Sequence, residues 1–245
     1  MDVFGCTGEL VYDIATQVAI NTGFITPIEI RVLQHYPKSK LDTDEIDWQI
    51  VKNVILKDRE RAQLVSEYVY HIMKNANLNT VTLLIPEVEW SKLYMKELAI
   101  LFKDVNVRVF ELYGGNRIFE YDKNTGDRIE LKKEEKEDAY SAIRNPNIRT
   151  VFSATTFFFE GADIPCIQAV VNCYGGKDSK RVRQQCGRAM RLFKNKNVAY
   201  IHEIKDNNNP ILESQFRHRL EIYQKVYNAK VIYSSYKKGD IYIDR

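Results

Sequence analysis

The sequence predicts an α/β fold in which a mainly parallel sheet is covered by helices on both faces. Short apolar runs without strict alternation recur along the chain, and helix-favouring segments separate them. The apolar runs span residues 81–86, 107–112, 148–154, 169–174 and 197–204, and the helical segments span 88–102, 130–144 and 179–193. Parallel strands that are buried on both faces have this continuous apolar character, and helices connect them. The pattern therefore indicates three layers, with the sheet in the middle.

Further elements precede this repeating pattern. Residues 28–33 (IEIRVL) alternate apolar and charged side chains, which predicts a half-buried strand. Residues 15–21 favour a short helix, and residues 42–75 place apolar side chains at helical spacing. The composition changes after Pro37 from apolar and β-branched to charged, so we separate residues 1–37 from the rest of the chain.

Two segments depart from the alternation of strand and helix. Residues 116–127 (NRIFEYDKNTGD) are rich in turn formers and predict an inserted excursion, with a hairpin turn at 124–127. After Asn208 an amphipathic helix is expected to run to about Asn228. Two short strand candidates, VIYSS and DIYID, lie beyond it near the end of the chain.

Composition narrows the class of protein. The 245 residues are 44% hydrophobic and 28% charged, and no apolar run approaches the roughly 18 residues that a membrane span requires. The first residues lack the basic and apolar regions of a secretory signal, so we expect a soluble, cytoplasmic protein without a membrane partner. A net charge of +3 is too small to identify a nucleic-acid binder by itself.

The cysteines and histidines argue against other chemistries. The four cysteines, at positions 6, 166, 173 and 186, form no CxxC pair, so we expect reduced core thiols instead of disulfides or a zinc site. The four histidines show no HxxxH or HxH spacing, which argues against a metal site. No GxSxG sequence is present, so a hydrolytic triad of that kind is not expected.

The most informative segment ends in QQCGRAMR. Gln184, Arg188 and Arg191 are spaced i, i+4 and i+7, which would place them on one face of a helix. Gly187 between them weakens a helix, which suggests that another surface approaches the backbone there. Two arginines on one helical face can bind the γ-phosphate of a nucleotide held by a neighbouring surface. The alternative is an ordinary solvated basic helix.

The segment ATTFFFEGADIP lies just upstream. Thr155 and Thr156 come directly after a predicted strand end and could bind a nucleic-acid phosphate, and Asp163 beyond the turn could accept hydrogen bonds from a ribose. The threonines and the aspartate could equally cap turns. The three phenylalanines at 157–159 could stack on bases or lie in the core.

Taken together, these two segments resemble motifs V and VI of superfamily 2 helicases, in the C-terminal lobe, which has a RecA-like fold. The resemblance implies that Thr155 and Thr156 contact the nucleic-acid backbone. It implies an ATP-binding surface made of Glu160, Gly161, Asp163 and Gly187, and catalytic roles for Gln184, Arg188 and Arg191. Arg191 would be the arginine finger.

An earlier region resembles the surroundings of motif IV. LLIPEVEWSKLYMKEL (83–98) precedes VFELYGG (109–115), and the likeness implies nucleic-acid contacts at Pro86 and Gly114. Core packing alone could also explain the apolar residues of both stretches. The chain is most similar in layout to the phage UvsW and XPB-like group, whose connector resembles residues 4–32.

The resemblance implies a division of the chain into three parts. Residues 1–37 would be a connector from a missing first lobe, residues 38–207 the RecA-like lobe, and residues 208–245 a C-terminal extension. The cellular location implied is the cytoplasm of a bacterium, or of the host cell if a phage encodes the protein.

The sequence contains neither a GxxxxGK[ST] phosphate loop nor a DEAD or DExH sequence. In helicases the first lobe supplies both, so the resemblance implies ATP with Mg²⁺ as cofactor, the Mg²⁺ being held by a first lobe present in cis or in trans. We expect no ATP hydrolysis by this chain alone. DNA is the expected partner, with RNA as the alternative. A non-catalytic RecA-like binding module for nucleic acid or protein, and a fragment of a restriction-type or chromatin-type translocase, are the competing hypotheses.

Overall fold

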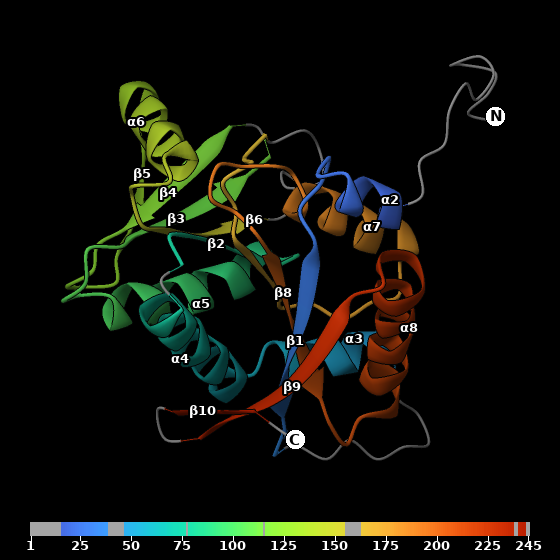
Figure 1. Ribbon diagram of the computed structural model, residues 1–245. Helices are drawn as coiled ribbons and strands as arrows, with labels where there is room; N and C mark the ends of the chain where they lie inside the picture. Colours follow the sequence, from blue (N-terminus) through green and yellow to red (C-terminus); the bar gives the residue numbers. More distant parts are fainter. Residues whose placement is uncertain are drawn as a thin grey trace, which may run out of the picture.

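A single mixed sheet forms the centre of the molecule (Figure 1). The computed structural model describes residues 16–38, 47–76, 78–114, 116–154, 163–237 and 240–243. Within these residues the sheet has ten strands in the order β10-β9-β1-β8-β7-β2-β6-β3-β4-β5. The predicted α/β class, with a mainly parallel sheet between helices, is confirmed.

The strands from β9 to β3 in this order are all parallel, and the two ends of the sheet are antiparallel. The parallel strands are β1 (Ile28–His35), β2 (Thr80–Leu84), β3 (Arg108–Tyr113), β6 (Thr150–Ala154), β7 (Ala169–Asn172), β8 (Ala199–Asp206) and β9 (Lys230–Lys237). The antiparallel strands are β4 (Arg117–Tyr121), β5 (Arg128–Glu130) and β10 (Asp240–Ile243). Every residue of β2, β6 and β7 is buried, which explains why the sequence of these strands does not alternate.

Helices cover both faces of the sheet and enclose two hydrophobic cores. One core lies under α4 (Arg59–Asn75), α5 (Val88–Leu101) and the short α3 (Trp48–Val51) with its π-helical continuation η2 (Lys52–Leu56). The other lies under α6 (Lys133–Arg144), α7 (Ser179–Ala189) and α8 (Pro210–Tyr227), with α2 (Thr16–Asn21) beside α8. The three predicted layers are therefore present (Figure 1).

Three sequence-based expectations need correction. The helix expected over residues 42–75 is divided, because Asp58 caps a new helix by accepting a hydrogen bond from the Arg61 amide, 2.9 Å. The helix expected over 179–193 ends at Ala189. The excursion at 116–127 contains β4, which together with β5 extends the sheet beyond β3, and the hairpin turn expected at 124–127 is confirmed as the connection between these two strands.

The segments outside the expected lobe contribute to the same sheet. β1 lies between β8 and β9, with Ile30 opposite Ile201 on one side and Val231 on the other. The helix expected after Asn208 is α8, and the two strand candidates after it are β9 and β10. No helix among the described residues is long and apolar enough to cross a membrane.

Candidate nucleotide-facing site

Two arginines that the sequence predicts to bind the nucleotide, Arg188 and Arg191, lie at the edge of the sheet where β1, β7 and β8 begin. Helix α7 starts beyond the carboxyl end of β7 and runs back across the sheet, so its last residues reach the opposite edge. There the Thr26 amide, two residues before β1, donates a 2.8 Å hydrogen bond to the Met190 carbonyl. In open α/β sheets, ligands commonly bind at the carboxyl ends of the strands. The arginines instead lie at the edge where strands start, because α7 is antiparallel to them.

An ion pair brings the two motifs together. Arg191 Nη1 is paired with Asp163 Oδ1, although 28 residues separate them in sequence. Both side chains remain accessible, at 38% and 72% exposure. The sequence-based interpretation assigned both residues to the nucleotide-facing surface, and the structure places them in direct contact.

Arg188 lies beside this pair and completes a cationic cluster. Burial lowers the pKa of Arg188, and the neighbouring charge of Arg191 lowers it further, while Asp163 acts in the opposite direction. Arg144 at the end of α6 adds a third guanidinium group, whose Nε donates to the Asp163 carbonyl at 3.3 Å. The described part of the cluster thus holds more guanidinium groups than carboxylates. Such a surface favours an anion such as a phosphate.

The helical geometry predicted for the arginines holds only in part. Gln184 and Arg188 lie on α7 and are half-buried, but Arg191 lies beyond the helix end. A 3.4 Å hydrogen bond from the Arg191 amide to the Arg188 carbonyl continues the turn, which keeps the two arginines close. Gly187 is exposed, and a Cβ added there would meet no atom within 4 Å. Nothing in the described part of the chain therefore requires glycine at this position.

Sequence reasoning missed two cations of this site. Arg144 comes from α6, upstream of both motifs, and Lys196 from the turn before β8, five residues after Arg191. The only local signal was that Arg144 is a basic residue in the last turn of its helix. Neither contact could be predicted without the tertiary structure.

Two of the residues assigned to nucleic acid are described, and both lie at the opposite edge of the sheet. Pro86 and Gly114 come just after β2 and β3 and are both exposed. Both strands pair with β6, so its carboxyl end lies between them. The remaining predicted site residues, Thr155, Thr156, Glu160 and Gly161, lie outside the described residues, as do Phe157, Phe158 and Phe159.

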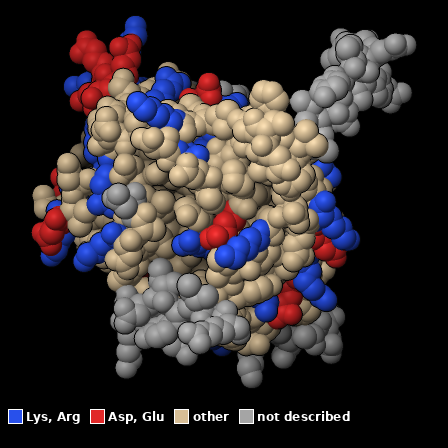
Figure 2. Space-filling model, viewed as in Figure 1, with Lys and Arg blue, Asp and Glu red and all other residues tan. Residues whose placement is uncertain are grey.

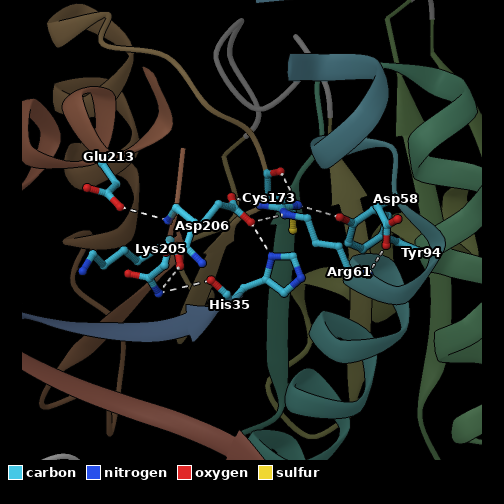
Figure 3. A network of polar contacts seen from close by, with 10 residues as sticks. His35, Asp58, Arg61, Tyr94, Cys173, Lys205, Asp206 and Glu213 are labelled. Atoms are coloured by element: carbon cyan, nitrogen blue, oxygen red, sulfur yellow. Dashed lines mark hydrogen bonds and ion pairs between the residues drawn. The ribbon is translucent and has the colours of Figure 1, made fainter. Parts of the chain in front are cut away.

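A buried ion network stabilises this second edge (Figure 3). Arg61 donates to both carboxylate oxygens of Asp206, at 2.8 and 3.0 Å, and to the Tyr94 hydroxyl at 2.7 Å. His35 Nδ1 lies 2.7 Å from Asp206 Oδ1. The network joins α4 and α5 to the carboxyl ends of β1 and β8. Because these groups are almost completely buried, we assign the network to the fold and not to a ligand site.

Charge on the visible face of the molecule is mixed (Figure 2). Acidic side chains gather where α6 lies, and the surface over α2 is largely uncharged. Among the described residues, no group of three or more His, Cys, Asp or Glu side chains is placed to hold a metal ion. Three of the cysteines, Cys166, Cys173 and Cys186, are free and buried, and Cys6 lies outside the described residues.

Comparison with known proteins identifies the domain. The sequence is 22% identical over 235 residues to predicted helicase 22 of the Sulfolobus islandicus filamentous virus, covering 94% of this chain and 39% of the viral protein. The fold is similar to a fragment of a predicted HsdR subunit of a Vibrio vulnificus type I restriction enzyme, with a TM-score of 0.65, 15% identity, and coverage of 95% of this chain and 41% of that one. UvsW of phage T4 gives a TM-score of 0.60 at 14% identity, over 86% of this chain and 42% of UvsW.

The chain thus spans about two fifths of the length of these relatives. A model of the helicase conserved C-terminal domain family matches residues 64–193, which include α7, Asp163 and Arg191. The chain belongs to the helicase conserved C-terminal domain family.

Proposed function

We propose that the chain is the second motor lobe of an ATP-dependent DNA helicase or translocase. The observation that carries this proposal is the cluster of Asp163, Arg188 and Arg191 at one edge of the sheet, while Pro86 and Gly114 lie exposed at the opposite edge. A motor lobe of this kind needs two separate surfaces, one for the nucleotide and one for the nucleic acid.

Arg191 is the proposed arginine finger. In the lobe alone its guanidinium group is paired with Asp163, which holds the side chain in an accessible position. When a first lobe presents ATP, the γ-phosphate oxygens compete with the Asp163 carboxylate for the same donors. An arginine in this role stabilises the charge of the phosphoryl-transfer transition state, an effect worth about 10³ to 10⁵ in rate. Arg188 adds a second positive charge to the phosphate, and Gln184 lies one turn earlier on the same helix.

The first lobe would supply the phosphate loop and the ligands of Mg²⁺. Asp163, the carboxylate found at the described cluster, is engaged by Arg191, so we assign Mg²⁺ to carboxylates of the other lobe. ATP would lie between the lobes, and its hydrolysis would open the cleft. With the strand held at the Pro86 and Gly114 edge, closing and opening would move the lobe along the nucleic acid.

DNA is the proposed nucleic acid. The type ISP restriction-modification enzyme LlaBIII, which has a similar fold with a TM-score of 0.59, was solved bound to DNA. The Mss116p helicase domain, solved with an RNA duplex, is less similar, with a TM-score of 0.52. Single- and double-stranded DNA and RNA should therefore be compared as stimulants.

Nucleic-acid-stimulated ATPase activity tests the proposal. The chain would be combined with its native N-terminal half, or with the product of a neighbouring gene, and each component assayed alone. We expect activity from the combination and none from the chain by itself. Arg191→Ala should lower kcat by about 10³-fold or more, and Lys225→Ala, which changes an exposed cation on α8, should not. Full activity of Arg191→Ala would refute the finger assignment.

The competing function is a binding module without turnover. If the combination binds nucleic acid tightly but hydrolyses no ATP under any condition, the second motor lobe is the wrong assignment. That result, binding without ATP hydrolysis, would support the non-catalytic binding module.

A further inference from the structure

Lys196 is a buried cation next to the arginine cluster. The residue is only 8% exposed, and its ammonium group donates hydrogen bonds to the carbonyls of Pro165, Ile167 and Ala189, at 2.9, 3.2 and 2.9 Å. A lysine ammonium has three donors, so all of them are satisfied. The acceptors that the ammonium finds are backbone carbonyls, not a carboxylate.

The three acceptors come from the two segments that make up the nucleotide-facing site. Pro165 and Ile167 lie just after Asp163, and Ala189 is the last residue of α7, between Arg188 and Arg191. The carbonyl of a last-turn residue has no partner within its own helix. The ammonium group therefore joins the segment of Asp163 to the end of the helix that carries Arg188.

We infer that Lys196 is a positioning residue that fixes the segment of Asp163 against the end of α7, so that the Asp163–Arg191 pair forms. The inference rests on the proposed function for its consequence in catalysis. Its structural part, the placement of Arg191, can be tested without any ATP hydrolysis.

The energetics argue against a simple packing role. Burial, together with the nearby charge of Arg191, lowers the pKa of Lys196 to about 8, while Cys166 acts in the opposite direction. Burying a cation without a carboxylate is costly unless hydrogen bonds compensate for the lost water. An apolar side chain would fill the same space without this cost, but it could not connect the three carbonyls.

The arginine side chains report directly on the geometry. In the wild-type chain, the Nε–H signals of Arg188 and Arg191 would be assigned by NMR. Lys196→Met removes the ammonium group and keeps much of the side-chain volume, and Lys194→Met is the matched control at an exposed position two residues away. We expect Lys196→Met to shift the Arg191 signal and to speed its exchange with water. Lys194→Met should leave both properties unchanged.

A folded Lys196→Met chain with an unchanged Arg191 signal would overturn the inference. If Lys196→Met does not fold, a pH titration of the wild-type chain replaces it. Deprotonation of Lys196 near pH 8 removes one of its three donors, so the Arg191 signal should track the same midpoint as the Lys196 Nζ signal. The other titratable or charged groups that face the site are the Cys166 thiol, whose pKa burial raises, and the side chains of Arg144, Arg188, Arg191 and Asp163. An Arg191 signal that stays constant through the Lys196 midpoint would also overturn the inference.

Kinetics of the combined lobes separate positioning from general destabilisation. Lys196→Met should lower kcat at least 10-fold at a temperature where the chain is fully folded, with a smaller change in the KM for ATP. If the Arg191 signal shifts but no combination hydrolyses ATP, the positioning inference stands and the proposed function fails. If kcat and the Arg191 signal are both unchanged, Lys196 contributes only to the fold.

Discussion

His202 shows how a single buried side chain makes the stability of this domain depend on pH. The ring is 1% exposed, and its Nδ1 lies 2.7 Å from the Tyr68 hydroxyl. Burial lowers the pKa of His202 to about 3, and the charge of Arg31 contributes to the same effect. The folded chain therefore keeps this imidazole neutral at any pH where the fold is normally studied.

This lowered pKa predicts a loss of stability in mild acid. Between about pH 6.5 and 3 the unfolded chain binds a proton at His202 and the folded chain does not. The free energy of unfolding should therefore fall by up to about 1.4 kcal/mol for each pH unit below 6.5. Urea unfolding at pH 7, 6 and 5 measures the slope. His202→Gln should reduce the slope, and His218→Gln, on the exposed side of α8, should not. Equal slopes in all three proteins would contradict the assignment.

The buried pair of Arg61 and Asp206 has the opposite requirement, since both groups must stay charged. Burial by itself would raise the pKa of Asp206, but the charge of Arg61 and the hydrogen bonds from His35 and Arg61 lower it below its usual value of 3.8. The resulting stability is present above pH 3.8 and is lost as the pH falls through the lowered pKa. This loss comes at lower pH than that caused by His202, and the two can be separated by mutation.

Arg61→Met should leave Asp206 as a buried charge without its main partner. We expect the free energy of unfolding to fall by about 3–5 kcal/mol, measured in urea at pH 7. The double variant Arg61→Met with Asp206→Leu should recover part of that loss, because neither charge is then buried. A loss below 1 kcal/mol in the single variant would show that the pair contributes little.

At the level of elements, burial decided what the sequence could predict. The parallel strands were found because burial on both faces leaves continuous apolar runs, as in β2 and β6. The strand β4, which pairs antiparallel with β3 so that Phe110 lies opposite Glu120, was expected only as part of an excursion. Its sequence, RIFEY, mixes charged with apolar residues and therefore lacks the continuous apolar run of the buried strands. The same limit applies to β5, which is only three residues long.

The candidate site was predictable where its residues share one segment. The spacing of Gln184 and Arg188 correctly placed both on α7. The end of that helix was not predictable, because Met190 forms its hydrogen bond with Thr26, more than 160 residues away in sequence. The contributions of Arg144 and Lys196 likewise depend on tertiary contacts.

Two glycines around α7 should respond to alanine in opposite ways. A Cβ at Gly175, in the connection from β7 to α7, would lie 2.7 Å from both Gln215 and Trp48, so Gly175→Ala should cost about 1–3 kcal/mol of stability. A Cβ at Gly187 meets nothing, so Gly187→Ala should stabilise the chain by about 0.5–1 kcal/mol. Thermal unfolding of both variants measures the difference. If Gly187→Ala also lowers the ATPase activity of the combined lobes, the glycine serves the interface and not the fold; unchanged activity would exclude that role.

In the whole molecule, strands from the two ends of the sequence lie next to each other in the sheet. β1 lies near one end of the chain and β9 near the other, yet they are neighbours in the sheet, with Val32 opposite Tyr233. α8 packs on the same side as α7, and its buried Arg219 is paired with Glu203 of β8 at 2.8 Å. The residues after 207 therefore cover the core that lies under α6, α7 and α8, and through β9 they form hydrogen bonds with one side of β1.

This arrangement predicts that the segment from 208 onward is needed for folding, even though the motifs lie before it. A chain ending at residue 207 would lack Phe216 and Tyr223, so the apolar side chains that they cover would be exposed, and the Glu203 carboxylate would lose its partners Arg219 and Tyr223. We expect no cooperative thermal unfolding and a collapsed, aggregating species in size-exclusion chromatography. Among the described elements, a chain ending at residue 237 loses β10, whose strand partner is β9, and it should keep a cooperative transition. If the shorter chain instead unfolds cooperatively and keeps the Arg188 and Arg191 NMR signals of the full chain, residues 208–245 form an extension that the lobe does not require.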